Sequence, residues 1–275
     1  MEADCIMTDW VKVPFSVKKL KKTFTHWQEA LAGKAWNTLY IENHDHPRVI
    51  DRYGSLKYRV ESGKMLAAMY FLQQGTPFIY QGQEIGMTNI ELDSIDKFKD
   101  VITFNNQKIF AKFGIKGDRF LKLANKASRE NARTPVQWTD GEYAGFSTAE
   151  PWFSLNPNYK EINVEAAEND ENSLLNFYRK LVKFRKEHTV AIYGDYKEHL
   201  KNSKNLYVYE RSYEGEKLLV ICSFTEKHIK FEAPEGFDLA KGELALSNYR
   251  KCPVTKNSFV TRPFETRVYY FKDGE

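Results

Sequence analysis

Apolar residues recur with helical spacing in three stretches of this chain. In the first they occupy one face at i, i+4, i+7 and i+11 counted from Leu20, and Ser16 stands where an N-cap is expected. This pattern predicts a helix that ends at about Leu31, with the neighbouring lysines, Lys21 among them, on its solvated face. Similar spacing predicts helices over 58–72 and 174–188.

Short apolar segments flank the second predicted helix, one at 37–42 and one at 78–80. A strand, a helix and a second strand joined by short connections are typical of a parallel βαβ unit. Both segments end in polar residues, as strands do at the C-terminal rim of a (β/α) barrel, where active sites lie. Loops and aromatic residues fill 90–170, where we expect one helix within 104–127.

The pattern changes to a period of two after Gly194. The segments 206–209, 217–224 and 267–271 therefore read as antiparallel strands, with a turn at 213–216 between the first two. We expect these strands to form a separate all-β domain.

The composition limits the class of protein. Hydrophobic residues make up 42% of the chain, enough for an ordinary core, and 41 basic residues nearly balance 37 acidic ones. Because the basic residues are scattered, nucleic acid is a poor candidate partner. No apolar run approaches the roughly 18 residues that span a bilayer, so we expect no membrane partner.

The cysteines and the N-terminus favour a cytoplasmic protein. Cys5, Cys222 and Cys252 are odd in number and widely spaced, so neither a disulfide framework nor a zinc site is predicted. We expect no metal and no other cofactor. Met1–Asp4 lacks the basic and apolar regions of a signal peptide.

The polar cluster that follows the segment 37–42 is the strongest candidate for chemistry. Asn43, His44 and Asp45 follow the apolar residues directly, and Arg48 comes shortly after them. A fixed carboxylate stabilises the positive charge that develops on a sugar when its glycosidic bond breaks. A triplet of this kind is by itself most often a turn or a helix cap, so the flanking residues decide its meaning.

The flanking residues resemble those of the α-amylase superfamily, in particular its oligo-1,6-glucosidase and α-glucosidase branch. Three segments carry the resemblance in order and spacing: Asn43-His44-Asp45 with Pro47-Arg48, Tyr58-Arg59-Val60-Glu61-Ser62, and Gly75-Thr76-Pro77-Phe78-Ile79-Tyr80-Gln81-Gly82. The resemblance implies that Asp45 stabilises the transition state and that His44 and Asn43 bind the glucose. It also implies an α/β fold in which 1–190 form the C-terminal portion of a (β/α)8 TIM barrel and 191–275 an antiparallel β-sandwich.

A second specific motif is Arg129-Glu130-Asn131-Ala132-Arg133-Thr134-Pro135-Val136-Gln137-Trp138, which in this branch reads Arg-Asp-Asn-Ala-Arg-Thr-Pro-Met-Gln-Trp. The resemblance implies that Arg129 reaches the terminal glucose, since an Arg fork suits vicinal hydroxyls. In relatives its carboxylate partner lies near the start of the barrel, so we expect Arg129 to be left without that partner. A structural ion pair is the alternative for Arg129 and the preferred interpretation for Arg133.

Two residues depart from the pattern of the branch. His46, where Gln is frequent, is expected to be a solvent-exposed loop residue, with contact to an acceptor sugar as the alternative. Glu84 follows Gln83 where two Glu are usual. The family's general acid belongs to the fifth barrel strand, so we expect a structural role for Glu84.

Retaining glycoside hydrolysis needs a nucleophile and a general acid. The family carries both upstream of this motif, whereas only residues 1–44 precede Asp45 here. We therefore expect the C-terminal half of a glycosidase, inactive alone and completed by a separately encoded N-terminal half, with small α-glucoside oligosaccharides as substrates. Part of a trehalose-6-phosphate hydrolase and a non-catalytic sugar-binding remnant remain as alternatives.

Overall fold

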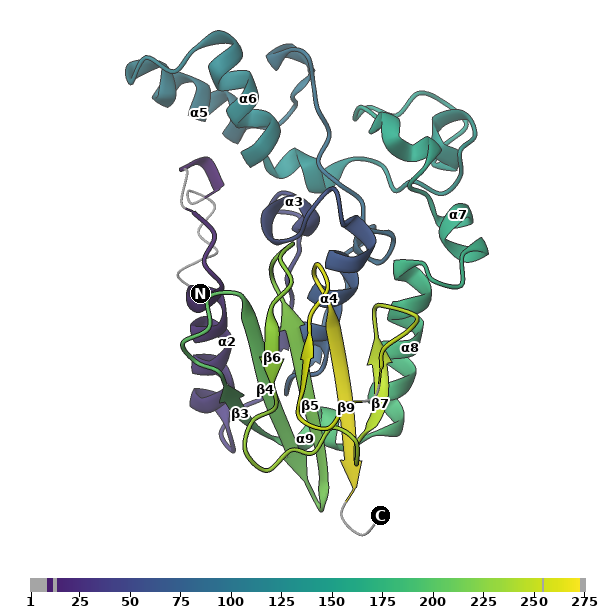
Figure 1. Cartoon of the computed structure of the whole chain (residues 1–275). Helices are drawn as coiled ribbons and strands as arrows, with labels where there is room; N and C mark the ends of the chain where they lie inside the picture. Colours follow the sequence, from purple (N-terminus) through teal and green to yellow (C-terminus); the bar gives the residue numbers. More distant parts are fainter. Residues whose placement is uncertain (1–8, 12–13, 254, 273–275) are drawn as a thin grey trace. The chain divides into compact units, whose positions relative to one another are not determined.

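The computed structural model describes residues 9–11, 14–253 and 255–272 (Figure 1). These residues divide into two compact units. The first unit holds the described residues before Ser16, with Ile41–Leu56 and Ile79–Leu175, and the second holds Ser16–Tyr40, Lys57–Phe78 and the described residues from Asn176 onward. The predicted boundary near residue 190 stays a prediction. The expectations for Met1–Asp4 and Cys5 lie outside the described residues.

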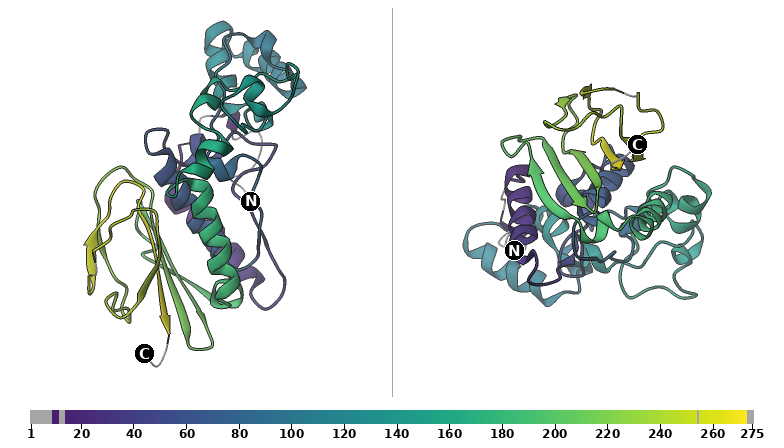
Figure 2. Two further views of the ribbon diagram at one scale, coloured as in Figure 1. Left: turned by 90° about the vertical axis from the view of Figure 1, so that its right-hand side faces the viewer. Right: turned by 90° about the horizontal axis from the view of Figure 1, so that it is seen from below.

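The second unit combines helices with an antiparallel sheet. Its helices are α2 (Val17–Leu31), α4 (Arg59–Phe71), most of α8 (Leu174–Glu187) and the short α9 (Val190–Tyr193). The five-stranded sheet has the order β3 (Asp195–His199), β4 (Leu206–Tyr213), β5 (Glu216–Ser223), β9 (Thr266–Lys272), β7 (Glu243–Ser247). A separate pair consists of β6 (Lys230–Glu232) and β8 (Ser258–Val260). The three long helices lie along one face of the five-stranded sheet (Figures 1 and 2).

Strand β4 shows how both faces of this sheet are buried. Leu206 and Val208 belong to an apolar cluster that also contains Phe231 of β6. On the opposite face, the Tyr209 hydroxyl donates to the backbone oxygen of Met69 in α4, at 2.9 Å. Alternate side chains of a strand point to opposite faces, so the period of two in the sequence becomes two layers of packing.

The turn between β4 and β5 confirms its prediction. Tyr213 pairs with Glu216, and between them Glu214 and Gly215 have φ angles of 47° and 80°. Two consecutive positive φ values are the geometry of the tight hairpin turn whose twist matches that of the flanking strands. The antiparallel sheet predicted from the sequence is therefore present.

The first predicted helix begins where expected and is less solvated than expected. Ser16 caps α2, and its hydroxyl accepts from the backbone nitrogen of Lys19 at 3.4 Å. The expectation that Lys21 is solvated is wrong, because its side chain is buried and its ammonium lies 3.4 Å from Glu198 of β3. A tertiary carboxylate compensates the cost of burying this cation.

The predicted parallel strand pair is confirmed, with shorter strands than expected. Strand β1 (Thr38–Leu39) pairs in parallel with β2 (Thr76–Pro77), and α4 lies between them in the sequence. The placement of a strand at 78–80 is wrong, although Phe78 still donates its backbone N–H to Leu39. Two strands that have no further neighbour among the described residues sustain only a short ladder.

The first unit consists of loops and short helices. Among the described residues these include α3 (Val49–Tyr53), α5 (Val101–Lys112), α6 (Gly117–Ala127), α7 (Val164–Asn169) and several 3-10 helices, among them η1 (Gln83–Ile85) and η3 (Arg129–Arg133). The expectation of a helix within 104–127 is confirmed by α6, and Gly114, with φ of 79°, separates it from the further helix α5. No helix in the described ranges has the length and apolar character to cross a membrane.

Candidate active site

A buried ion pair closes the loop that carries the candidate residues. Glu42 and Arg48 stand at the two ends of this loop with no exposed side-chain surface, and Arg48 Nη1 donates to Glu42 Oε1 at 2.7 Å. Glu42 Oε2 accepts from the backbone nitrogen of Val49 at 2.9 Å. Burial raises the pKa of Glu42 although the neighbouring Arg48 opposes the rise. The pair fixes both ends of the loop, because two fully buried charges are stable only together.

Arg48 also ties this loop to two distant segments. Its Nη1 donates to the backbone oxygen of Gln81 at 2.8 Å and its Nε to that of Asn131 at 3.1 Å. Gly82 permits this approach, since a Cβ there would lie 3.1 Å from Arg48 Nη1 and 2.3 Å from the sulfur of Met87. The φ of Gly82, 85°, also favours glycine. Three segments of the first unit thus meet around one guanidinium.

A local turn orients Asp45. The side-chain oxygen of Asn43 accepts from the backbone nitrogen of Asp45 at 2.8 Å, a two-residue Asx turn. His44 is largely exposed, and its Nε2 lies 3.4 Å from Asp45 Oδ2. The Asp45 side chain keeps 31% of its surface exposed. Asn43 therefore positions the carboxylate, while His44 stands beside it at the surface.

Two arginines join Asp45 to a second carboxylate, Asp100. Arg129 Nη1 and Arg133 Nη2 both donate to Asp45 Oδ1, at 2.9 Å and 3.1 Å. Arg129 grips Asp100 with Nε and, at 3.2 Å, with Nη2, and Arg133 Nη1 reaches it at 3.1 Å. Two carboxylates and two guanidiniums make a neutral group, called the Arg/Asp quartet below. Asp45 Oδ2 contacts only His44 among the described residues.

Asp100 is held from the α5 side of the quartet. It caps α5, and its Oδ1 accepts from the backbone nitrogen of Ile102 at 2.9 Å. Glu130 accepts from the backbone nitrogen of Asp100 itself at 2.8 Å. Burial acts to raise the pKa of Asp100, but the hydrogen bonds from Arg129 and Ile102 outweigh it and the pKa falls below its ordinary value. Asp100 thus stays ionised at neutral pH and is no general acid.

Asp100 was not among the candidate residues predicted from the sequence, although its position before a helix could have indicated it. An acidic residue directly before a helical segment is a typical N-cap, and Asp100 stands directly before Val101. The residues next to Asp100 in the sequence do not show that its carboxylate faces Arg129 and Arg133, which lie far along the chain.

The structure gives Arg129 two carboxylate partners within this chain, Asp45 and Asp100. That it lacks the carboxylate which relatives carry near the start of the barrel stays a prediction, whereas the prediction for His46 is wrong. His46 was expected to be exposed, yet it is 3% exposed and its Nδ1 lies 2.7 Å from Asp9 Oδ2. A buried imidazole beside a carboxylate is stable as a paired group. Contact of His46 with an acceptor sugar stays a prediction.

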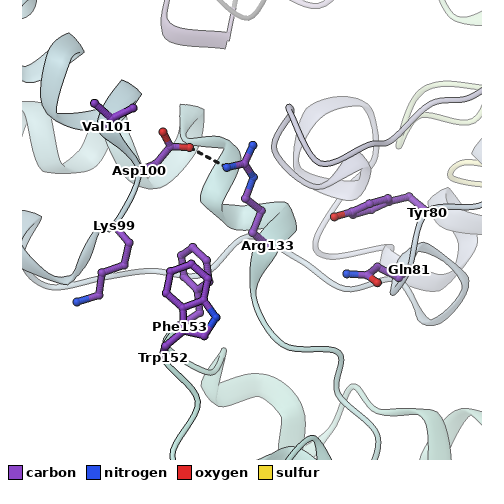
Figure 3. Close-up of a pocket in the computed structure, with 8 residues that line it drawn as sticks. All are labelled: Tyr80, Gln81, Lys99, Asp100, Val101, Arg133, Trp152 and Phe153. Carbon is purple, nitrogen blue, oxygen red and sulfur yellow. Dashed lines mark hydrogen bonds and ion pairs between the residues drawn. The ribbon is translucent and has the colours of Figure 1, made fainter.

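A cavity of about 540 Å³ lies beside the quartet, within the first unit. Asp100 and Arg133 line it, with Tyr80 and Gln81 on one side and two aromatic residues, Trp152 and Phe153, on another (Figure 3). The volume falls within the roughly 300–1,000 Å³ that small-molecule sites occupy. A fixed carboxylate, several N–H donors and an adjacent cavity suit the binding of a polyhydroxylated ligand.

Other acidic groups do not join this site. Burial raises the pKa of Glu84, and its Oε2 is buried without a hydrogen-bond partner in the described part of the chain. It does not line the cavity. No group of three or more His, Cys, Asp or Glu side chains among the described residues is arranged to hold a metal ion.

The chain resembles proteins of known activity over nearly its whole length. It is 42% identical over 266 residues to the oligo-1,6-glucosidase of Halalkalibacterium halodurans, covering 96% of this chain and 47% of that protein. It is 44% identical to the oligo-1,6-glucosidase of Parageobacillus thermoglucosidasius, covering 94% and 47%. The crystal structure of trehalose-6-phosphate hydrolase from Bacillus licheniformis matches with a TM-score of 0.92 and 39% identity, over 96% of this chain and 48% of that one.

The chain therefore spans about half the length of the curated relatives that it matches. The family model described as alpha amylase, catalytic domain, matches residues 3–194, the segment that contains the quartet and the cavity. The structural relatives agree with this assignment. The chain belongs to the α-amylase catalytic-domain family.

Proposed function

We propose that this chain is the C-terminal part of a retaining α-glucosidase of the oligo-1,6-glucosidase type. Its substrates are short oligosaccharides with a terminal α-linked glucose. The observation that carries the proposal is the state of Asp45: two arginines fix one carboxylate oxygen, and the other faces His44. A carboxylate held in advance stabilises the cationic transition state without reorganisation.

The proposal assigns a role to each residue of the site. Asp45 stabilises the charge on the sugar, His44 and Arg129 bind hydroxyls of the terminal glucose, and Asn43 orients Asp45. The nucleophile and the general acid belong to a further part of the barrel, because the quartet offers no carboxyl group that donates a proton. In this proposal 1–190 form the C-terminal portion of the TIM barrel and 191–275 the C-terminal sandwich.

An assay of the purified chain tests this division of roles. On isomaltose and p-nitrophenyl α-glucoside we expect no turnover by the chain alone. We also expect hydrolysis with retention when the chain is mixed or co-expressed with an N-terminal barrel half, and loss of that hydrolysis on Asp45→Asn. Turnover by the chain alone that Asp45→Asn abolishes would contradict the split of catalytic residues. We further propose a cytoplasmic location, which cell fractionation tests.

Trehalose 6-phosphate is the second candidate substrate. The similarity to a trehalose-6-phosphate hydrolase of known structure favours it. Comparing trehalose 6-phosphate with isomaltose in the complemented enzyme separates the two activities. If complementation restores no hydrolysis and calorimetry still detects isomaltose or glucose on the chain, the third possibility, a non-catalytic sugar-binding remnant, is supported.

A further inference from the structure

A large aromatic side chain lies exposed on the wall of the cavity beside the quartet. Trp152 is 75% exposed. Its ring centroid lies 4.2 Å from that of Phe153, and both rings line the cavity (Figure 3). A tryptophan that contributes this little to a core leaves an apolar surface of considerable size in contact with water.

Polar residues also line the cavity, beside Val101 and Tyr80. Gln81, Lys99 and Arg133 bring N–H donors to it, and Asp100 brings a carboxylate. A pyranose ring combines an apolar face of C–H groups with a rim of hydroxyls. An aromatic platform opposite hydrogen-bonding groups is complementary to both features.

One side chain borders both the cavity and the proposed glucose site. Arg133 lines the cavity and also donates to Asp45 Oδ1 at 3.1 Å. A saccharide whose terminal glucose is held by Asp45 and Arg129 would therefore have the cavity as its neighbour across Arg133.

We propose that Trp152 is the stacking platform for the glucosyl unit that adjoins the terminal glucose of the substrate. This inference rests on the proposed function of the Asp45 site and adds a specificity-determining residue to it. The indole face packs on the C–H face of that unit, and Gln81, Lys99 and Arg133 bring donors for its hydroxyls.

Binding measurements on the full chain test the platform. Calorimetry with glucose, isomaltose and isomaltotriose is combined with NMR of the tryptophan indole groups, with the Trp152 signal assigned from Trp152→Ala. We expect isomaltotriose to shift the Trp152 signal. We expect Trp152→Ala to weaken isomaltotriose binding roughly fivefold to tenfold and to leave glucose binding unchanged. The matched control is Trp138→Ala, an exposed tryptophan of the same unit outside the cavity lining.

The outcomes separate the platform from the proposed function. If Asp45→Asn weakens all three sugars while Trp152→Ala weakens none, the platform is wrong and the glucose site stands. If Trp152→Ala weakens isomaltotriose while Asp45→Asn changes nothing, the proposed glucose site is wrong. A Trp152 signal that millimolar isomaltotriose does not shift would overturn the platform.

Discussion

One pair of arginines in each unit shows two different uses of the guanidinium group. In the second unit Arg185 and Arg211 are buried and bind main-chain carbonyls. Arg185 donates to the oxygens of Phe71, Gln73, Gly75 and Ala191. Arg211 donates to those of Leu72 and Gly194, among others. In the first unit Arg129 and Arg133 are partly exposed and bind carboxylates.

The difference separates a structural use of arginine from a functional one. The last carbonyls of a helix lack partners within it, and the two buried guanidiniums satisfy those at the end of α4. Burial lowers the pKa of both Arg185 and Arg211 to about 10, so both remain charged at neutral pH. Partly exposed pairs contribute little to stability. The quartet therefore serves mainly to orient Asp45.

The largest effect is expected from Arg185→Met. It removes a donor from four buried carbonyl groups, of which that of Ala191 keeps Arg211 as a second donor, so we expect the free energy of unfolding to fall by about 3 kcal/mol or more. Chemical denaturation of the purified chain measures this. The control Arg250→Met, at an exposed position of the same unit, should leave stability unchanged. Equal stability of the Arg185 variant and the wild type would show that the bonds from Arg185 to the main chain do not stabilise the fold.

A somewhat smaller loss is expected from Glu42→Gln. The change leaves the Arg48 charge buried without its carboxylate, which we expect to cost roughly 2–3 kcal/mol. Because the pair closes the loop of Asp45, isomaltose binding should weaken as well. Denaturation and calorimetry provide the two readouts, and Glu150→Gln, at an exposed site of the first unit, is the control. Unchanged sugar binding in a destabilised variant would show that the loop does not depend on the pair.

Arg129→Met should weaken sugar binding and change stability little, whereas Arg185→Met is expected to lower stability. We expect stability to change by only about 1 kcal/mol, since Arg133 still neutralises Asp100. Isomaltose affinity should fall about tenfold because Asp45 loses one of its two donors. Arg119→Met, an exposed arginine of α6, serves as the matched control. A large loss of stability with intact binding would class Arg129 with the buried arginines.

The smallest effect concerns pH. The lowered pKa of Asp100 means that its ionised form is favoured in the folded state. The stabilisation is present above the ordinary pKa of 3.8 and is lost as pH falls through the lower folded value. Between pH 5 and pH 2, the unfolding temperature of Asp100→Asn should therefore fall less steeply with pH than that of the wild type. Identical slopes would mean that Asp100 is not stabilised by its arginines.

Sequence patterns predicted the parts of this protein that depend on near neighbours. The capped helix α2 and the hairpin turn at 213–216 follow from residues a few positions apart, whose geometry is fixed locally. The motif that contains Asp45 identified the family for the same reason, since its residues are consecutive. The exact bounds of the two-residue strands β1 and β2 were not predicted, because each pairs with a partner far along the chain.

By itself, then, the sequence determined the periodicities, the turns, the family and the candidate residues Asp45 and Arg129. Only the tertiary structure decided which charges meet. It buried Lys21 against Glu198 and His46 against Asp9, and it brought Asp100 to the arginines. Local sequence spacing does not predict these pairs, because the energy of a buried charge depends on which distant segment supplies the opposite charge.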